Sequence, residues 1–88
     1  MAKKRPKMPV PPEELSPQQL ADRIRDWAAS QGYTYHLGPH ATEFGMVRVA
    51  DPAGGHTSTV IPNAHHGRRL RKDQVRYTVQ RLNANWRN

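Results

Sequence analysis

Cysteine is absent from this 88-residue chain, and acidic residues and long apolar runs are scarce. Without cysteine, the sequence excludes a disulfide framework, a thiolate metal site and a cysteine nucleophile. No stretch approaches the roughly 18 to 20 consecutive apolar residues of a membrane-spanning helix. No apolar segment follows the basic start, so a secretory signal is not expected either. We therefore expect a cytoplasmic protein without a membrane anchor.

Positive charge is in excess and is unevenly distributed. Basic residues outnumber acidic ones by 14 to 7, which gives a formal net charge of +7. Residues 62–88 carry seven basic side chains against Asp73 alone. A run of positively charged residues attracts an anionic partner, and nucleic acid is the commonest such partner. The last third of the chain therefore predicts a phosphate-binding surface, with a solvated charged face as the alternative.

The first 15 residues, MAKKRPKMPVPPEEL, hold four of the eight prolines. Proline lacks the N–H that a helix or an inner strand needs, so extended or disordered chain is expected here. We predict a basic, proline-rich, flexible tail over residues 1–15 and a folded domain over residues 16–88. The basic cluster in the tail is either a nucleic-acid arm or a solubilising end.

Two amphipathic helices are expected, over residues 17–30 and 72–84. Ser16 and Gln19 form a capping-box pair before the first helix, and Gly32 is a suitable stop after it. Apolar residues recur at helical spacing in both segments. These stripes consist of Leu20, Ile24, Trp27 and Ala28 in the first helix, and Val75, Val79, Leu82 and Trp86 in and after the second.

Three strands are expected between the helices, over residues 33–37, 43–50 and 56–61, because apolar and polar residues alternate there. Tyr33 and Tyr35 share one face of the first strand, either in the core or as a base-stacking platform. For the second strand, the sequence does not decide which face points toward the core. Its two sets of side chains are Phe44, Met46 and Arg48, and Gly45, Val47 and Val49.

The resulting order, α-β-β-β-α, predicts an α+β domain. The simplest arrangement packs both helices on one face of a three-stranded antiparallel sheet, because each helix must bury one apolar stripe. The other face of the sheet stays open to solvent or to a partner. This is the layout of a double-stranded-RNA-binding-like fold.

Histidine is the residue type best suited to catalysis in this chain. The sequence shows no paired carboxylates and no Gly-rich phosphate loop. Histidine exchanges protons near neutral pH, and RNA is cleaved when a base deprotonates its 2′-OH and cations stabilise the phosphate. No metal or other cofactor is expected, because the adjacent His65 and His66 lack further ligands at metal-binding spacing.

Three motifs follow one another in this chain. Gly38, Pro39 and His40 come directly after the first predicted strand. Residues 60–67, VIPNAHHG, contain the end of the third predicted strand, and residues 68–72, RRLRK, lead into the last helix. Their order resembles the HicA family of toxin–antitoxin RNA-cleaving toxins. That family carries Gly-Ser-His at the first place, where this chain has proline for the serine, then a strand that ends in a Val-Pro-x-His-like segment, and then a basic stretch before the last helix.

The resemblance covers about residues 18–84 and implies a metal-independent endoribonuclease that cleaves mRNA, an mRNA interferase. It implies His40 as the catalytic acid or base, and a HicB-type antitoxin protein as the partner that covers the active site. Beside this histidine we assign an RNA- and phosphate-binding group. Its members are His65, His66, Arg68, Arg69, Lys72 and Arg76.

Two other functions stay open on the same fold, which small phage and bacterial proteins also use without toxin activity. One is a nucleic-acid-binding module without catalysis. The other is a protein-interaction module that contacts an acidic partner through its open sheet face, with Phe44 and Met46. Tyr77 lies off the apolar stripe of the second helix, so we expect it to be exposed near the basic residues, where it could stack on a base.

Overall fold

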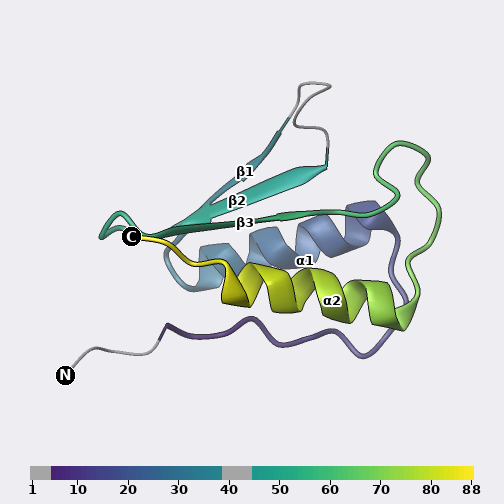
Figure 1. Ribbon diagram of the computed structural model, residues 1–88, viewed down its shortest axis with the longest axis horizontal. Coiled ribbons are helices and arrows are strands. Elements are labelled where there is room, and N and C mark those ends of the chain that lie inside the picture. Colours follow the sequence, from purple (N-terminus) through teal and green to yellow (C-terminus); the bar gives the residue numbers. More distant parts are fainter. Residues whose placement is uncertain (1–4, 39–44) are drawn as a thin grey trace.

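The computed structural model describes residues 5–38 and 45–88 and has the predicted α-β-β-β-α order (Figure 1). Its elements are helix α1 (Pro17–Ser30), strands β1 (Thr34–Leu37), β2 (Met46–Ala50) and β3 (His56–Val60), and helix α2 (Lys72–Ala84). The α+β fold class is confirmed, and both helices have the predicted bounds. Strands β1 and β3 are each one residue shorter than predicted.

Both ends of helix α1 lie where the sequence predicts them, and hydrogen bonds between nearby residues cap each end. The Ser16 hydroxyl accepts the N–H of Gln19 at 3.0 Å, and the Gln19 side chain accepts the N–H of Ser16 at 2.9 Å. At the other end, Gly32 adopts a φ of 74°, which directs the N–H of Tyr33 to the carbonyl of Ala28 at 2.9 Å. These two caps satisfy backbone groups that a helix end otherwise leaves unpaired.

The sheet is antiparallel, in the order β1-β2-β3, and both helices lie on one side of it (Figure 1). Val47 and Val49 are fully buried, whereas Arg48 between them is exposed. The two valines therefore face the helices, which settles the parity that the sequence leaves open. Two neighbouring rows across the sheet are Leu37, Val47 and Thr59, and His36, Arg48 and Ser58.

Strand β2 begins later than predicted. The sequence predicts its start at residue 43, but residues 43 and 44 lie outside the described part of the chain. Gly45 has a φ of 79°, in the left-handed region, and so cannot continue a strand that begins at Met46. The predicted alternation is confirmed over Met46–Ala50.

The core lies between the sheet and the two helices. Trp27, Tyr33, Tyr35 and Trp86 are partly buried and pack against it, so the two tyrosines belong to the core and not to a base-stacking platform. The sequence did not single out Leu70, although its side chain is fully buried and its N–H bonds to the carbonyl of Leu15 at 2.7 Å. The fully buried apolar side chains are Leu20, Ile24, Ala28, Val47, Val49, Leu70, Val75, Val79 and Leu82.

Two buried threonines connect β3 to α2. The hydroxyl of Thr57 donates to the carbonyl of Leu82 at 2.6 Å, and the hydroxyl of Thr59 donates to the carbonyl of Thr78 at 3.2 Å. Leu82 lies in the last turn of α2, where carbonyls have no partner within the helix. A buried hydroxyl must be hydrogen-bonded, so these contacts satisfy both threonine hydroxyls and hold the helix along the strand.

Residues 5–15 form a third layer, on the side of the helices that faces away from the sheet (Figure 1). The N–H of Met8 donates to the side-chain oxygen of Asn83 at 2.9 Å, and the Asn83 amide donates back to the Met8 carbonyl at 3.0 Å. The Met8 side chain is only 4% exposed, and Pro11 is buried. The sequence predicts a flexible tail over residues 1–15. The part of it that the structure describes is packed on the domain instead, because Met8 and Asn83 supply apolar contact and backbone hydrogen bonds.

Arg5 connects this N-terminal layer to the C-terminal end of the chain. Its guanidinium lies 4.4 Å from the centre of the Trp86 ring and donates to the side chains of Asp51 at 3.0 Å and Asn88 at 2.9 Å. The N–H of Gly55, together with the Arg5 guanidinium, holds the pKa of Asp51 below its usual value. One arginine thus joins the N-terminal segment, the turn after β2 and the last residues.

We predict that Met8→Ala lowers the free energy of unfolding by about 2 kcal/mol or more, because it removes a buried side chain. It should also speed proteolysis within residues 5–15. Val10→Ala is the matched control, because Val10 lies in the same segment but is 37% exposed, and its effect should stay within about 0.5 kcal/mol. Urea denaturation and limited proteolysis measure both. A Met8→Ala protein as stable as the parent would show that the segment is not packed in solution.

Candidate nucleic-acid-binding site

The predicted binding residues lie together at one end of the molecule, in the loop between β3 and α2 and in the first turns of α2. His65, His66, Arg68 and Arg69 are exposed in this loop. Lys72 and Arg76 follow as exposed residues on α2. We call these six residues the loop–α2 surface: His65, His66, Arg68, Arg69, Lys72 and Arg76.

The loop is a compact turn held by its own hydrogen bonds. Asn63 and Gly67 both have positive φ, of 60° and 72°. The N–H of Gly67 donates to the Asn63 carbonyl at 2.8 Å, and the Asn63 side chain donates to the Arg68 carbonyl at 3.3 Å. The Arg68 N–H donates to Nδ1 of His66 at 3.2 Å, which leaves Nε2 of that ring as the nitrogen for a ligand. The side chains of the loop–α2 surface are therefore presented by a defined backbone.

Two arginines in this region pair with acidic residues. The Arg69 guanidinium donates to the backbone carbonyl of Glu14 at 3.1 Å and lies 3.8 Å from the Glu14 carboxylate. The Arg71 side chain donates to Asp73 at 3.1 Å, and this hydrogen bond holds the pKa of Asp73 below its usual value. Part of the positive charge that the sequence shows here is thus neutralised within the protein.

Three cations of the loop–α2 surface differ from these paired arginines. Within residues 5–38 and 45–88, no acidic side chain forms a salt bridge with Arg68, Lys72 or Arg76. All three side chains are exposed. Cations without an acidic partner keep their full field and are the ones that attract phosphate. These three residues are the strongest binding candidates in the described part of the chain.

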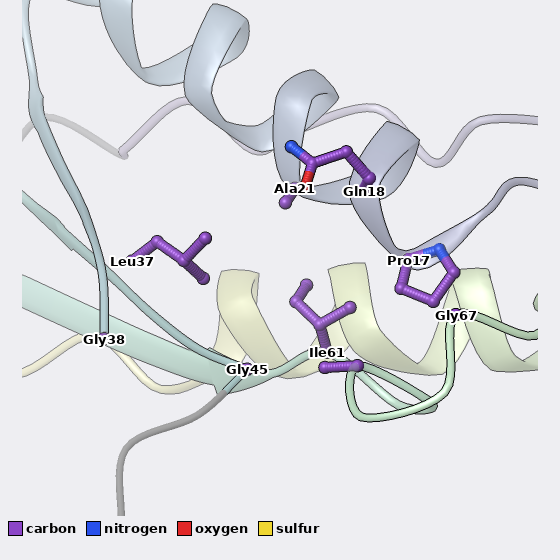
Figure 2. Close-up of a pocket in the computed structure, with 9 residues that line it drawn as sticks. Pro17, Gln18, Ala21, Leu37, Gly38, Gly45, Ile61 and Gly67 are labelled. Carbon is purple, nitrogen blue, oxygen red and sulfur yellow. The ribbon is translucent and has the colours of Figure 1, made fainter. Parts of the chain in front are cut away.

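A largely apolar cavity of about 320 Å³ opens beside the loop (Figure 2). The side chains of Leu37 and Ile61 point into it, and Gly38 and Gly67 lie on its rim. Pro17, Gln18, Ala21, Gly45 and Ala64 complete the lining. The cavity thus brings the end of β1 next to the loop that carries His65 and His66. His40, the predicted catalytic residue, follows Gly38 by two positions and lies outside the described residues.

Gly45, directly before β2, lies close to the loop between β3 and α2. Its carbonyl accepts the N–H of Ile61 at 2.7 Å. A Cβ at this position would lie 2.9 Å from the Cβ of Ala64 and 3.1 Å from the carbonyl oxygen of Ile61. Any side chain here would be crowded by the loop, and the positive φ would add backbone strain.

We expect Gly45→Ala to lower the free energy of unfolding by about 2 to 4 kcal/mol, from left-handed strain together with crowding. Gly32→Ala is the matched control, because Gly32 has a similar φ of 74° but nothing lies within 4 Å of its Cβ position. Strain alone should cost the control about 1 kcal/mol. Chemical denaturation of both variants measures the difference. Equal losses would mean that Gly45 does not contact the loop closely.

The remaining described histidines lie elsewhere. His36 and His56 are exposed on the outer face of the sheet, where His36 lies opposite Arg48 and His56 lies opposite Ala50. Met46 is half-buried on the same face, and Phe44, which we predict beside it in the protein-interaction alternative, lies outside the described residues. The structure therefore does not bring His36 or His56 to the loop–α2 surface.

A second hollow lies on the exposed side of α2, and the sequence indicates only some of its lining residues as candidates. Arg76 and Tyr77 were singled out, but Gln74 and Gln80 were not. Each lies three residues from Tyr77 on a helix whose other side is apolar, and this spacing is the signal that could have found them. The hollow is lined by Pro62, Asp73, Gln74, Arg76, Tyr77 and Gln80.

The described residues contain no group of three histidine, aspartate or glutamate side chains arranged to hold a metal ion. Neither helix of the structure, among the residues it describes, has the length and apolar character needed to cross a membrane.

Comparison of the chain with protein-family models, with curated proteins and with solved structures finds no match in any of the three. The resemblance to the HicA family therefore rests on the order and spacing of the three motifs.

Proposed function

We propose that this protein binds RNA through the loop–α2 surface and cleaves it without a metal ion, in the manner that its resemblance to HicA toxins implies. One observation carries the binding half of the proposal. Arg68, Lys72 and Arg76 are exposed, have no acidic partner among the described residues, and extend from a compact turn onto a helix. Such a group suits a chain of phosphates, because binding releases the counterions that phosphates condense.

The spacing of the cations supports a linear polyanion as the ligand. Lys72 and Arg76 are four residues apart on α2, so they are neighbours on one side of the helix. Arg68 precedes them in the loop, and Arg69 is held at the edge by Glu14. A polyanion that follows this side of α2 meets several cations in sequence. An isolated phosphate would engage only one or two of them.

The cleavage half of the proposal assigns His40 as the acid or base. A base removes the proton of a 2′-OH, and the 2′ oxygen attacks the adjacent phosphorus. The bond from phosphorus to the 5′ oxygen then breaks, and that oxygen takes up a proton, which leaves a 2′,3′-cyclic phosphate. Nearby cations such as Arg68 stabilise the charge that develops on the phosphate. Gly38 and Gly67 line one cavity, and this supports His40 acting near the loop.

The resemblance extends the proposal to a cellular role. A HicA-like toxin acts on mRNA in the cytoplasm and is neutralised by a HicB-type antitoxin that covers its active site. The loop–α2 surface, exposed in this structure, is the region that we propose such a protein would cover.

The binding surface is tested with Lys72→Ala/Arg76→Ala. For single-stranded RNA each lost phosphate contact lowers the salt slope by about 0.7, so we expect a slope reduced by about 1.4 and binding roughly 25-fold weaker at 0.1 M salt. Lys7→Ala/Arg87→Ala is the control, because it removes the same charge from exposed residues before α1 and beyond α2 that form no salt bridge among the described residues. Fluorescence anisotropy across a salt range measures both. Equal weakening by the two double variants would assign binding to net charge and not to this surface.

Cleavage is tested by incubating the parent, His40→Ala and His56→Ala with a long RNA in EDTA. We expect the parent and His56→Ala to cleave, and His40→Ala to lose at least 100-fold in rate, the lower end of the effect of a general acid or base. His56 is a matched control because it is exposed on the outer face of the sheet, away from the loop. Cleavage by His40→Ala at the parent rate would remove the catalytic assignment. RNA binding without cleavage by any of the three would favour the non-catalytic binding module.

A further inference from the structure

Tyr77 is 59% exposed, more than any other large apolar or aromatic side chain in the described part of the chain. The remaining described aromatic rings pack against the core. Tyrosine is usually half-buried at least, because its ring is largely apolar. Tyr77 lies directly after Arg76, beside the cations without acidic partners. The exposed ring is therefore accessible to a ligand that binds these cations.

The Tyr77 ring contacts Arg81 and also lines the hollow on α2. The Arg81 guanidinium lies 5.6 Å from the centre of the Tyr77 ring and donates to its hydroxyl at 3.1 Å. Arg81 is one turn further along α2 and does not line the hollow that Tyr77 lines. The contact with Arg81 therefore limits the orientations of the ring and leaves the hollow vacant beside it.

The lining of this hollow carries the functional groups that a nucleobase needs. Tyr77 lines the hollow with an aromatic ring, and Gln80 offers an amide donor and an amide acceptor for the base edge. The side-chain oxygen of Gln74 already accepts the N–H of Arg71 at 2.9 Å, so Gln74 offers its amide donor. Arg76 brings a positive charge to the same hollow. Stacking on an aromatic ring next to backbone-binding cations is how proteins hold single-stranded nucleic acids.

We propose that the hollow takes one unpaired base of a single-stranded RNA, stacked on Tyr77 and hydrogen-bonded by Gln74 or Gln80. Lys72 and Arg76 hold the adjoining phosphates. This inference rests on the proposed RNA binding and narrows its substrate class to single strands. A base inside a duplex is already stacked and paired, so it cannot enter the hollow without being pulled out of the helix.

The test separates the contribution of the bases from that of the phosphates. Affinities are measured for a uridine hexanucleotide and for a hexamer of abasic ribose phosphates with the same charge. We expect the parent to prefer the hexanucleotide. Tyr77→Ala should reduce this preference by about 5- to 150-fold, the range for one base stacked on an aromatic ring, whereas Tyr77→Phe should keep it. Affinity for a short RNA duplex should be unchanged in both variants.

The possible outcomes distinguish this inference from the proposed RNA binding. If Tyr77→Ala keeps the parent's preference while Lys72→Ala/Arg76→Ala weakens binding of both hexamers, the base site is wrong and RNA binding stands. If Tyr77→Ala weakens both hexamers equally, Tyr77 does not contact a base. If neither hexamer nor the duplex binds the folded parent, both proposals are overturned, and an acidic protein becomes the better partner for the cations.

Discussion

One-sided burial of the three-stranded sheet is the constraint on which the rest of the structure depends. Two helices cover one face, so Val47 and Val49 must turn toward them and Arg48 must turn away. The same alternation turns Thr57 and Thr59 of β3 toward α2, where their hydroxyls bond to helix carbonyls. Because α2 is held along β3 in this way, the chain must reverse direction between them. The polar loop that makes this reversal lies at the end of both layers, and its basic side chains are left in solvent.

A domain of this size has little apolar surface to bury, and the N-terminal layer adds to it. Met8 and Leu15 belong to the buried cluster, and Arg5 joins the segment to Trp86 and Asp51. A proline-rich segment is already restricted before it packs, so ordering it costs less conformational entropy than ordering an ordinary chain. The same segment brings Glu14 to Arg69. The layer that enlarges the core therefore also neutralises one cation at the edge of the loop–α2 surface.

Features that depend on residues close together in the sequence could be predicted. Features that depend on contacts between residues far apart in the sequence could not. The bounds of α1 follow from Ser16, Gln19 and Gly32, which act within a few residues, so they could be read directly. The inward face of β2 could not, because apolar residues occupy both of its sides. The packing of Met8 depends on Asn83, 75 residues away, and no local pattern signals such a pair. At the candidate site, the charge of residues 62–88 indicates a region of the chain, but a charge count treats Arg71 and Arg68 alike. Only the folded chain shows that Arg71 pairs with Asp73 and that Arg68 has no such partner among the described residues.

The two faces of α2 connect the fold to the proposed function. Val75, Val79 and Leu82 are fully buried against the sheet, so the helix can rotate very little about its own axis. With that face fixed, the positions away from it must be the exposed ones, and they hold Lys72, Arg76 and Tyr77. A rotation by one residue, about 100°, would carry Arg76 toward the core, where an unpaired charge is costly. The core therefore determines which side chains face solvent, and a binding site on this side of α2 is positioned by the same contacts that stabilise the domain.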